Sequence, residues 1–392
     1  MRVSKDRSHI RERAQDTADG CQLMKKVLVV FGLLVLVAGG ALGYAAKRLY
    51  DRADEPHRGY SGAEVFVEIP SGTSTRDIGR QLVAAGVVPD ERTFRIALWR
   101  SGRDRLLQAG EYRFRDPVSA LAVVDILARG QVHLRPITFP EGLTRHEMAD
   151  VFGRSELGTA EAFLVASERV ELVEALDPEA TDLEGYLFPE TYALPRDATA
   201  DDLVEAMVAQ FERIFDEGLR TQAAARELTI REVVTLASLI QTETGLDAER
   251  PLVSAVYNNR LGRRMPLQCD PTVIYALQRA GVYDGNLTRE NLRFDSPYNT
   301  YVYPGLPPGP IAAPGAADLR AAVQPADVSH LYFVSRNDGS HVFADSLREH
   351  NRNVQEYQVD YFRRRRAEGR EGDCRSGCHS LPPDYSARSA GL

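Results

Sequence analysis

The carboxyl group of Glu243 is the side chain whose position in the sequence best suits acid catalysis. Leu236, Leu239 and Ile240 lie at positions i, i+3 and i+4 of a predicted helix, and position i+7 is Glu243. The apolar face of the helix would therefore present this carboxylate toward the protein interior. Burial penalises the ionised form of a carboxyl group, so the pattern predicts a general acid that stays protonated near neutral pH.

The helix that carries Glu243 has its own start and stop signals. Thr229 and Glu232 have the spacing of a capping box, and Gly245 suits the residue after the last turn. Glu243 would thus lie at the helix C-terminus, whose partial negative charge also favours the protonated acid. The competing interpretation is a solvated polar residue at the end of an amphipathic helix. Gln241 points to roughly the opposite side.

Carboxylates and aromatic rings are also concentrated in the segment EGYLFPETY at 184–192, which contains Glu190 and Tyr192. Its turn-forming residues leave little helical or strand periodicity. Aromatic faces flanked by hydrogen-bonding groups suit a sugar ring, but they equally suit a hydrophobic anchor for a loop. Both interpretations stay open from this segment alone.

Two further polar segments follow the Glu243 helix. Gln268 and Asp270 precede a predicted helix at 272–280, where the simplest role for Asp270 is that of an N-cap. Tyr298 and Asn299 lie in SPYNTY, shortly before the rigid GLPPGP at 305–310. Loops of this kind often line clefts, although the prolines could serve only to fix the backbone.

Composition places these segments in a globular protein. The chain has 392 residues, of which 43% are hydrophobic and 27% charged, enough for two or three domains. A net charge of −8 argues against a protein that binds duplex nucleic acid. The histidines are dispersed, and Cys21, Cys269, Cys374 and Cys378 form neither a zinc pattern nor a disulfide framework. We interpret the Cys374/Cys378 segment as a flexible tail.

An uncharged run of 20 residues, Val27 to Ala46, is long enough to cross a bilayer as a helix. Lys and Arg residues before it favour a cytoplasmic N-terminus, with the large remainder outside. A cleaved signal peptide is the alternative. The run exceeds a normal signal-peptide core and follows a largely polar segment of 26 residues, so we interpret it as an uncleaved anchor.

Beyond the anchor, the pattern of strands and helices predicts a mixed α+β protein. A weak internal repeat of strand, Pro-x-Gly turn and helix occurs at 64–85 and again at 137–151. Further elements are expected as a strand at 110–114, helices at 120–127, 199–218, 251–261 and 272–280, and a hairpin across the turn Asn337-Asp-Gly339.

Several motifs occur in one order that resembles the YceG-like family, the membrane-bound endolytic murein transglycosylases. They are EGYLFPETY at 184–192, LASLIQTE at 236–243, YNNRL at 257–261, LQCDPTVIYAL at 267–277, SPYNTY at 296–301 and GLPPGPI at 305–311. The resemblance implies that Glu243 is the catalytic acid. Many relatives carry Glu at the position of Gln241. Because this chain has an amide there, Glu243 is the better candidate for the acid.

The resemblance also implies a small LysM-like subdomain, single-pass attachment to the bacterial cytoplasmic (inner) membrane and no metal or organic cofactor. The substrate would be the glycan strands of peptidoglycan, and membrane-bound peptidoglycan synthases are candidate partners. The expected divisions are a cytoplasmic segment 1–26, a transmembrane helix 27–46, a linker 47–62, a LysM-like subdomain 63–135, a catalytic domain 136–360 and a tail 361–392.

In this family the bond between N-acetylmuramic acid and N-acetylglucosamine is cleaved to leave 1,6-anhydromuramyl ends. One carboxyl group is enough for that reaction, whereas hydrolysis normally requires two. The expected substrate-binding residues are Glu190, Tyr192, Gln268, Asp270, Tyr298 and Asn299. Two alternatives stay open, namely a hydrolytic muramidase with Glu190 or Asp270 as second carboxylate, and a non-catalytic wall-binding scaffold.

Overall fold

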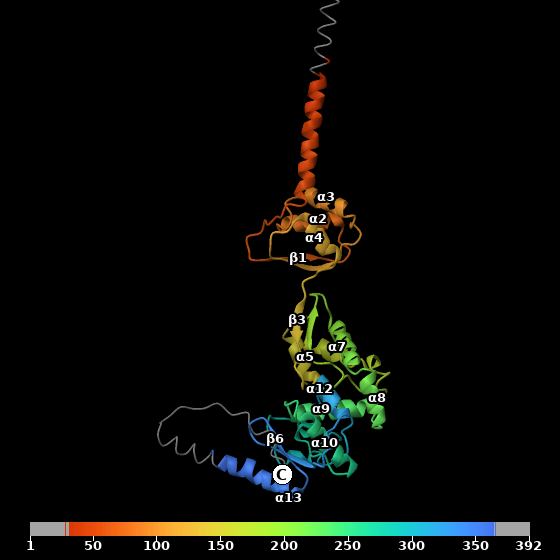
Figure 1. Cartoon of the computed structure of the whole chain (residues 1–392), viewed down its shortest axis with the longest axis vertical. Coiled ribbons are helices and arrows are strands. Elements are labelled where there is room, and N and C mark those ends of the chain that lie inside the picture. Colours follow the sequence, from red (N-terminus) through yellow and green to blue (C-terminus); the bar gives the residue numbers. More distant parts are fainter. Residues whose placement is uncertain (1–27, 29–30, 364, 366–392) are drawn as a thin grey trace, which may run out of the picture. The chain divides into compact units, whose positions relative to one another are not determined.

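The computed structural model describes residue 28, residues 31–363 and residue 365 (Figure 1). The expected cytoplasmic segment 1–26, with Cys21, lies outside the described residues, as does most of the expected tail, with Cys374 and Cys378. The chain divides into unit 1, Met1–Leu134, and unit 2, Arg135–Leu392. Each unit is described by itself below.

The N-terminal helix, Phe31–Arg52, is long and apolar enough to cross a membrane. Its length and composition are compatible with a single-pass anchor. Residues 47–62, expected as a linker, are helical as far as Arg52 and then pack onto unit 1. Ala53 is fully buried and its carbonyl accepts from Leu121 N at 3.1 Å, while His57 pairs with Val118 as a β-bridge.

The folded part of unit 1 is a two-stranded antiparallel sheet with three helices. Its elements are β1 (Val65–Ile69), α2 (Thr75–Ala84), α3 (Glu91–Ser101), β2 (Gly110–Phe114) and α4 (Ala120–Ala128). Alternate strand residues and one face of each helix form its core, which includes Val67, Leu82, Phe94, Tyr112 and Val124.

Unit 2 combines a larger helical core with two separate strand pairs. Its strands are β3 (Arg135–Thr138), β4 (Thr191–Leu194), β5 (Tyr332–Ser335) and β6 (His341–Ala344), paired as β3–β4 and β5–β6, both antiparallel. Its α-helices are α5 (Arg145–Gly153), α6 (Ala160–Ala166), α7 (Ala200–Ile214), α8 (Glu217–Ala225), α9 (Ile230–Glu243), α10 (Arg250–Gly262), α11 (Asp270–Arg279), α12 (Ala316–Val323) and α13 (Leu347–Val354). Short turns of other helix types are η1 (Val170–Leu172), η2 (Asn291–Arg293) and η3 (Gln355–Asp360).

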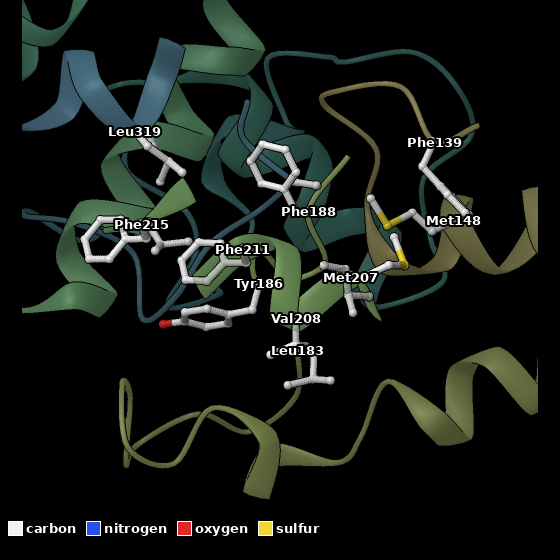
Figure 2. Packing of buried hydrophobic residues seen from close by; sticks show 14 of the residues in the cluster. Phe139, Met148, Leu183, Tyr186, Phe188, Met207, Val208, Phe211, Phe215 and Leu319 are labelled. Atoms are coloured by element: carbon white, nitrogen blue, oxygen red, sulfur yellow. The ribbon is translucent and has the colours of Figure 1, made fainter. Parts of the chain in front are cut away.

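Aromatic rings fill much of the unit 2 core (Figure 2). Phe211 and Phe215 stack with ring centroids 5.6 Å apart, and Tyr186 meets Phe211 edge-on at 5.2 Å. Met148 and Met207 occupy the same core from α5 and α7. This core fixes one side of α9, the helix that carries Glu243.

The two copies of the predicted strand, turn and helix repeat are both present, one in each unit. β1 leads through a turn into α2, and β3 leads through a similar turn into α5. The turn glycines Gly72 and Gly142 have φ of +80° and +82°, a left-handed conformation that favours glycine. The predicted hairpin is also confirmed as β5–β6, with Asn337 and Gly339 both at positive φ.

The prediction of one continuous helix over 199–218 is wrong. α7 ends at Ile214, and α8 begins after Asp216, whose side chain accepts from Leu219 N. Phe215 leaves the helical region with a ψ of 64° and is fully buried against Phe211. Packing of this ring, together with a new N-cap, interrupts an otherwise amphipathic pattern.

Candidate active site

Helix α9 forms as the sequence predicts. Thr229 and Glu232 form the reciprocal capping box at its start. Leu236, Leu239 and Ile240 are buried, and the helix packs against α10, α11 and α12. The apolar stripe therefore sets the rotation of the helix and brings Glu243, its last residue, to the inner side.

The way the helix ends differs from the prediction. Thr244 is the C-cap in an extended conformation, with φ −142° and ψ 136°, and Gly245 does not adopt a left-handed conformation. The Thr244 hydroxyl donates to Glu249 Oε2 at 3.1 Å, and Glu249 is held by the backbone N and the Nδ1 of His341 at 2.8 and 2.7 Å. This buried chain of contacts fixes the backbone directly after Glu243.

The Glu243 carboxyl group lies among apolar and weakly polar groups. Burial raises its pKa above the ordinary value of 4.5 and is the largest cause of the shift. The Cys269 thiol and the Tyr257 hydroxyl oppose this by hydrogen bonding to the carboxylate, and Tyr257 donates to Oε1 at 2.9 Å. Asp270 raises the pKa further through charge repulsion. The group is thus a carboxylic acid biased toward its protonated form.

A cavity of about 120 Å³ opens beside this carboxyl group. It is lined by residues from α9, α10, the start of α11 and the β5 strand with α13. They are Glu243, Tyr257, Arg260, Leu267, Gln268, Asp270, Tyr301, Tyr332, Phe333, Val334, Ser335, Leu347, His350 and Asn351. The structure therefore brings together Glu243, Gln268 and Asp270 of the residues predicted from the sequence.

Asp270 does not act as the helix cap that its position in the sequence suggests. The N-cap of α11 is Cys269, without a side-chain capping bond, and Asp270 is the first helical residue. The Asp270 carboxylate instead accepts from the Tyr301 hydroxyl at 2.6 Å at the cavity wall. Burial raises the pKa of Asp270, and the hydrogen bond from Tyr301 partly offsets that effect.

Gln268 is held in the cavity wall by an unusual backbone. Its φ is +51°, in the left-handed region that residues other than glycine rarely adopt. Arg260 fixes the backbone next to Gln268 by donating to the Leu267 carbonyl at 2.8 Å, and it also donates to the Leu331 carbonyl at 2.6 Å. Gln268 N donates to Thr300 O at 3.3 Å. Strain maintained by surrounding contacts is common where a side chain must point at a ligand.

Four predicted substrate-binding residues do not line this cavity. Tyr192 is buried against Phe139 and donates to the Phe188 carbonyl at 2.7 Å. Glu190 is exposed and hydrogen bonds Gln210. The other two belong to the SPYNTY loop and are described next.

Tyr298 and Asn299 support the loop in different ways. Tyr298 packs on Tyr275 with ring centroids 5.0 Å apart. Asn299 is 0% exposed, and its amide donates to the carbonyls of Leu292 and Phe294. Both amide hydrogen-bond donors of Asn299 are therefore used to hold the loop in shape.

The residues around Glu243 that sequence reasoning missed are Tyr257, Cys269, Tyr301 and His341. Tyr257 could have been found on the buried face of α10, because Val253 lies one turn before it and a buried tyrosine hydroxyl needs a partner. His341 lies on β6, and its closeness to Glu249 results from tertiary packing. No local spacing indicates that contact.

A second buried acid, Glu184, provides a comparison. Burial raises its pKa to about 8, and its oxygens accept from Arg145 N at 2.9 Å and from the Tyr275 hydroxyl at 3.2 Å. A cavity of about 410 Å³ lies nearby, lined by residues of α5 and α11, but Glu184 does not line it. Of these two buried acids, Glu243 is therefore the one that lines a cavity. Among the described residues, no group of three His, Cys, Asp or Glu side chains could hold a metal ion.

Comparison with known proteins finds relatives that are named endolytic murein transglycosylases. The chain is 31% identical over 338 residues to an endolytic murein transglycosylase of Bacillus subtilis (strain 168), covering 82% of this chain and 91% of that protein. It is also 31% identical over 356 residues to an endolytic murein transglycosylase of Streptococcus pneumoniae serotype 2 (strain D39), covering 83% of this chain. The chain spans 63% of the length of that relative.

A solved structure and a family model complete the comparison. The crystal structure of a YceG-like protein from Listeria monocytogenes superposes with a TM-score of 0.51 at 29% identity, covering 74% of this chain and 99% of that one. The model of the YceG-like family matches residues 67–356. This match covers parts of both units and every residue of the cavity, and the chain belongs to the YceG-like family.

Proposed function

We propose that this protein is an endolytic murein transglycosylase in which Glu243 is the acid and base of glycan cleavage. The observation that carries the proposal is the position of Glu243 in a cavity wall, with a raised pKa and a single tyrosine hydroxyl donating to it. The names of the relatives from B. subtilis and S. pneumoniae support the same substrate, the glycan strand of peptidoglycan.

The reaction needs one carboxyl group in two protonation states. Protonated Glu243 would donate to the oxygen that joins N-acetylmuramic acid to N-acetylglucosamine, and the C1–O bond would break as an oxocarbenium-like centre develops. The resulting carboxylate would then take the proton of the muramyl C6 hydroxyl, whose oxygen bonds to C1. Water is not consumed, and the acid is regenerated protonated. Neither step requires a metal or organic cofactor.

The environment of Asp270 favours this reaction over hydrolysis. A hydrolytic muramidase would need a second ionised carboxylate near the scissile bond. Asp270 is the second acid in the cavity, but burial raises its pKa and Tyr301 occupies one of its oxygens. Glu190, the other candidate, does not line the cavity. We assign Gln268 and Asp270 to substrate binding.

Product masses distinguish the two enzymatic readings. Digestion of purified peptidoglycan is expected to release muropeptides with 1,6-anhydromuramyl ends, which are lighter by one water than the corresponding reducing ends. Mass spectrometry of the products before and after borohydride treatment measures this, because only reducing ends are reduced. Products with reducible muramyl ends would instead support the hydrolytic muramidase.

Replacing Tyr257 by Phe is expected to shift the pH dependence of cleavage. Its hydroxyl lowers the pKa of Glu243, so its loss should raise that pKa further. The protonated acid is the active form in the first step, and the alkaline limb of the kcat/KM profile should therefore move to higher pH.

Tyr192→Phe is the matched control for Tyr257→Phe. It also removes a buried hydroxyl hydrogen bond, but outside the cavity, and its alkaline limb should stay in place. Coinciding limbs for wild type and Tyr257→Phe would show that this hydrogen bond does not set the working pKa.

We propose that the N-terminal helix is an uncleaved anchor in the cytoplasmic membrane and that the folded part of unit 1 and the whole of unit 2 lie on the extracytoplasmic side. Length and composition of the helix support the anchor, and the excess of Lys and Arg before it supports the orientation. Protease added outside permeabilised envelopes should digest the folded part of unit 1 and unit 2 and leave an anchored fragment. Complete protection of unit 2 would contradict this orientation.

We propose that the folded part of unit 1 is the LysM-like subdomain. Its order β1–α2–α3–β2 with antiparallel strands supports this.

An enzyme anchored by its N-terminal helix would meet new glycan strands as membrane-bound synthases release them. It should then cut nascent glycan internally and yield chains of intermediate length. Release of disaccharides only, from strand ends, would contradict endolytic cutting.

A further inference from the structure

The N-terminal helix is joined to the folded part of unit 1 by packed contacts. Ala53, one residue after the helix, is buried in the unit 1 core. Arg100 at the end of α3 donates to the Tyr50 carbonyl at 2.8 Å, forms an ion pair with Asp54 at 2.7 Å and lies over the Tyr50 ring at 4.0 Å. At the other end of α3, Asp90 lies 3.7 Å from Arg52. Both ends of α3 are thus tied to the end of the N-terminal helix, beside which α3 lies in Figure 1.

These contacts determine how far α3 lies from the bilayer. Tyr50 follows the end of the uncharged run at Ala46 by four residues, a rise of about 6 Å along a helix. The headgroup layer extends roughly 5 to 8 Å beyond the hydrocarbon on each side. With the end of the uncharged run placed at the edge of the hydrocarbon, Arg100, which touches Tyr50, would lie at the height of the lipid headgroups.

The outward face of α3 has the composition of a membrane interface. Arg92, Arg95 and Trp99 lie on one side of the helix at intervals of three and four residues, opposite the buried Phe94 and Leu98. Trp99 is 76% exposed, and both arginines are exposed. Among the ion pairs of the described residues, neither arginine has a carboxylate partner. Tryptophan favours the headgroup layer, and arginine pairs with lipid phosphates.

We propose that this face of α3, carrying Arg92, Arg95 and Trp99, lies in the headgroup layer of the membrane that the N-terminal helix spans. The folded part of unit 1 would then contact the bilayer through two helices. The N-terminal helix crosses the bilayer, and α3 lies along the bilayer surface. The inference rests on the proposed membrane anchor and extends it from one helix to a folded unit. The lipid partner is an anionic bilayer surface, since the two guanidinium groups supply the charge complementarity.

The alternative occupant of this face is a glycan strand, because exposed tryptophan rings also stack on sugars. The contacts with Tyr50, Asp54 and Arg52 favour the lipid, since they hold α3 next to the helix that enters the membrane. Both occupants would bury the same ring. The experiment therefore has to identify which one does so.

Trp99 is the only tryptophan of the chain, so intrinsic fluorescence reports on this face alone. Full-length protein is reconstituted into phosphatidylglycerol/phosphatidylcholine vesicles, and only vesicles recovered by flotation are used. We expect a blue-shifted emission that lipids brominated near the headgroup strongly quench and that lipids brominated deep in the acyl chain quench less. Protein that floats but shows solvent-like, unquenched emission would overturn the inference and leave the anchor intact. Failure to float would overturn both.

Matched variants separate this face from the rest of unit 1. Trp99→Phe combined with Phe66→Trp moves the tryptophan to β1, which Figure 1 draws on the side of unit 1 away from the N-terminal helix, and should abolish quenching by lipid. Arg92→Glu with Arg95→Glu should reduce quenching of Trp99, whereas Arg113→Glu on β2 should not. The proposal would be overturned if lipids did not quench Trp99 in floated protein and soluble glycan strands changed its emission. That result would assign the face to glycan.

Discussion

Replacing Glu243 by glutamine is expected to lower the rate of glycan cleavage about 10²- to 10⁴-fold, the usual cost of losing a general acid or base. The amide has nearly the same shape and can still accept from Tyr257, so the cavity should keep its form. It cannot donate a proton to the leaving oxygen and then recover one from the C6 hydroxyl. The measurement is the rate of appearance of 1,6-anhydromuramyl ends from purified peptidoglycan.

Gln241→Ala is the control on the same helix, because it removes a side chain two residues away that has no acid function. Its cleavage rate should fall far less than that of Glu243→Gln. A Glu243→Gln protein within a factor of two of wild type would remove Glu243 from the mechanism. An inactive Glu243→Gln protein that still binds peptidoglycan and complements a deletion would instead support the scaffold function.

The same substitution is expected to leave the protein at least as stable as wild type at neutral pH. Glu243 has a raised pKa in the folded state, so the folded state binds its proton more tightly than the unfolded state does. The associated stability is complete below the unfolded value of 4.5 and is lost as pH rises through the folded pKa. Thermal unfolding of both proteins at acidic and neutral pH should show the wild type losing more stability on going to neutral pH.

Replacing Arg250 by Met should lower the free energy of unfolding by about 3 to 5 kcal/mol, because it leaves a buried carboxylate without its partner. Arg250 Nε lies 2.6 Å from Asp318 Oδ1, and Asp318 is 0% exposed. Burial already raises the pKa of Asp318 to about 6, and Arg250 is the main influence that lowers it. The loss should therefore be larger at pH 8 than at pH 5, where Asp318 can be protonated.

Urea unfolding of unit 2 measures this effect, and two variants test its cause. Arg250→Met combined with Asp318→Leu should recover much of the lost stability, because no buried charge remains. Arg169→Met removes a guanidinium from an exposed cluster with Glu171, Asp201 and Glu205 and should cost far less stability, because solvent screens these pairs. Equal losses for Arg250→Met and Arg169→Met would contradict the role assigned to burial.

The sequence predicts best those features that local chemistry determines. The capping box at Thr229 and Glu232, the strand β1 and the hairpin turn at Asn337 are confirmed because each depends on residues a few positions apart. The break between α7 and α8 was missed, because Phe215 leaves the helix to stack in a core built from distant segments.

The site divides in the same way. The helical period identifies Glu243, and the segment that carries Gln268 and Asp270 contributes to the same cavity. The partners of these groups come from elsewhere in the chain, with Tyr257 on α10 and Tyr301 in a loop after α11. Asn299 lies in a motif that suggests a cleft, yet its amide is used inside its own loop. Tertiary packing determines which polar residues face a cavity. The spacing of residues along the sequence does not predict it.

The unbroken passage of the N-terminal helix into unit 1 also fixes an angle. A helix turns by about 100° and rises about 1.5 Å with each residue. One alanine inserted between Ala46 and Tyr50 would therefore rotate the folded part of unit 1 by about 100° about the helix axis, whereas four would leave it about 40° from its original direction and about 6 Å further along the axis. The number of residues between Ala46 and Tyr50 therefore determines the direction in which the folded part of unit 1 faces along the membrane surface.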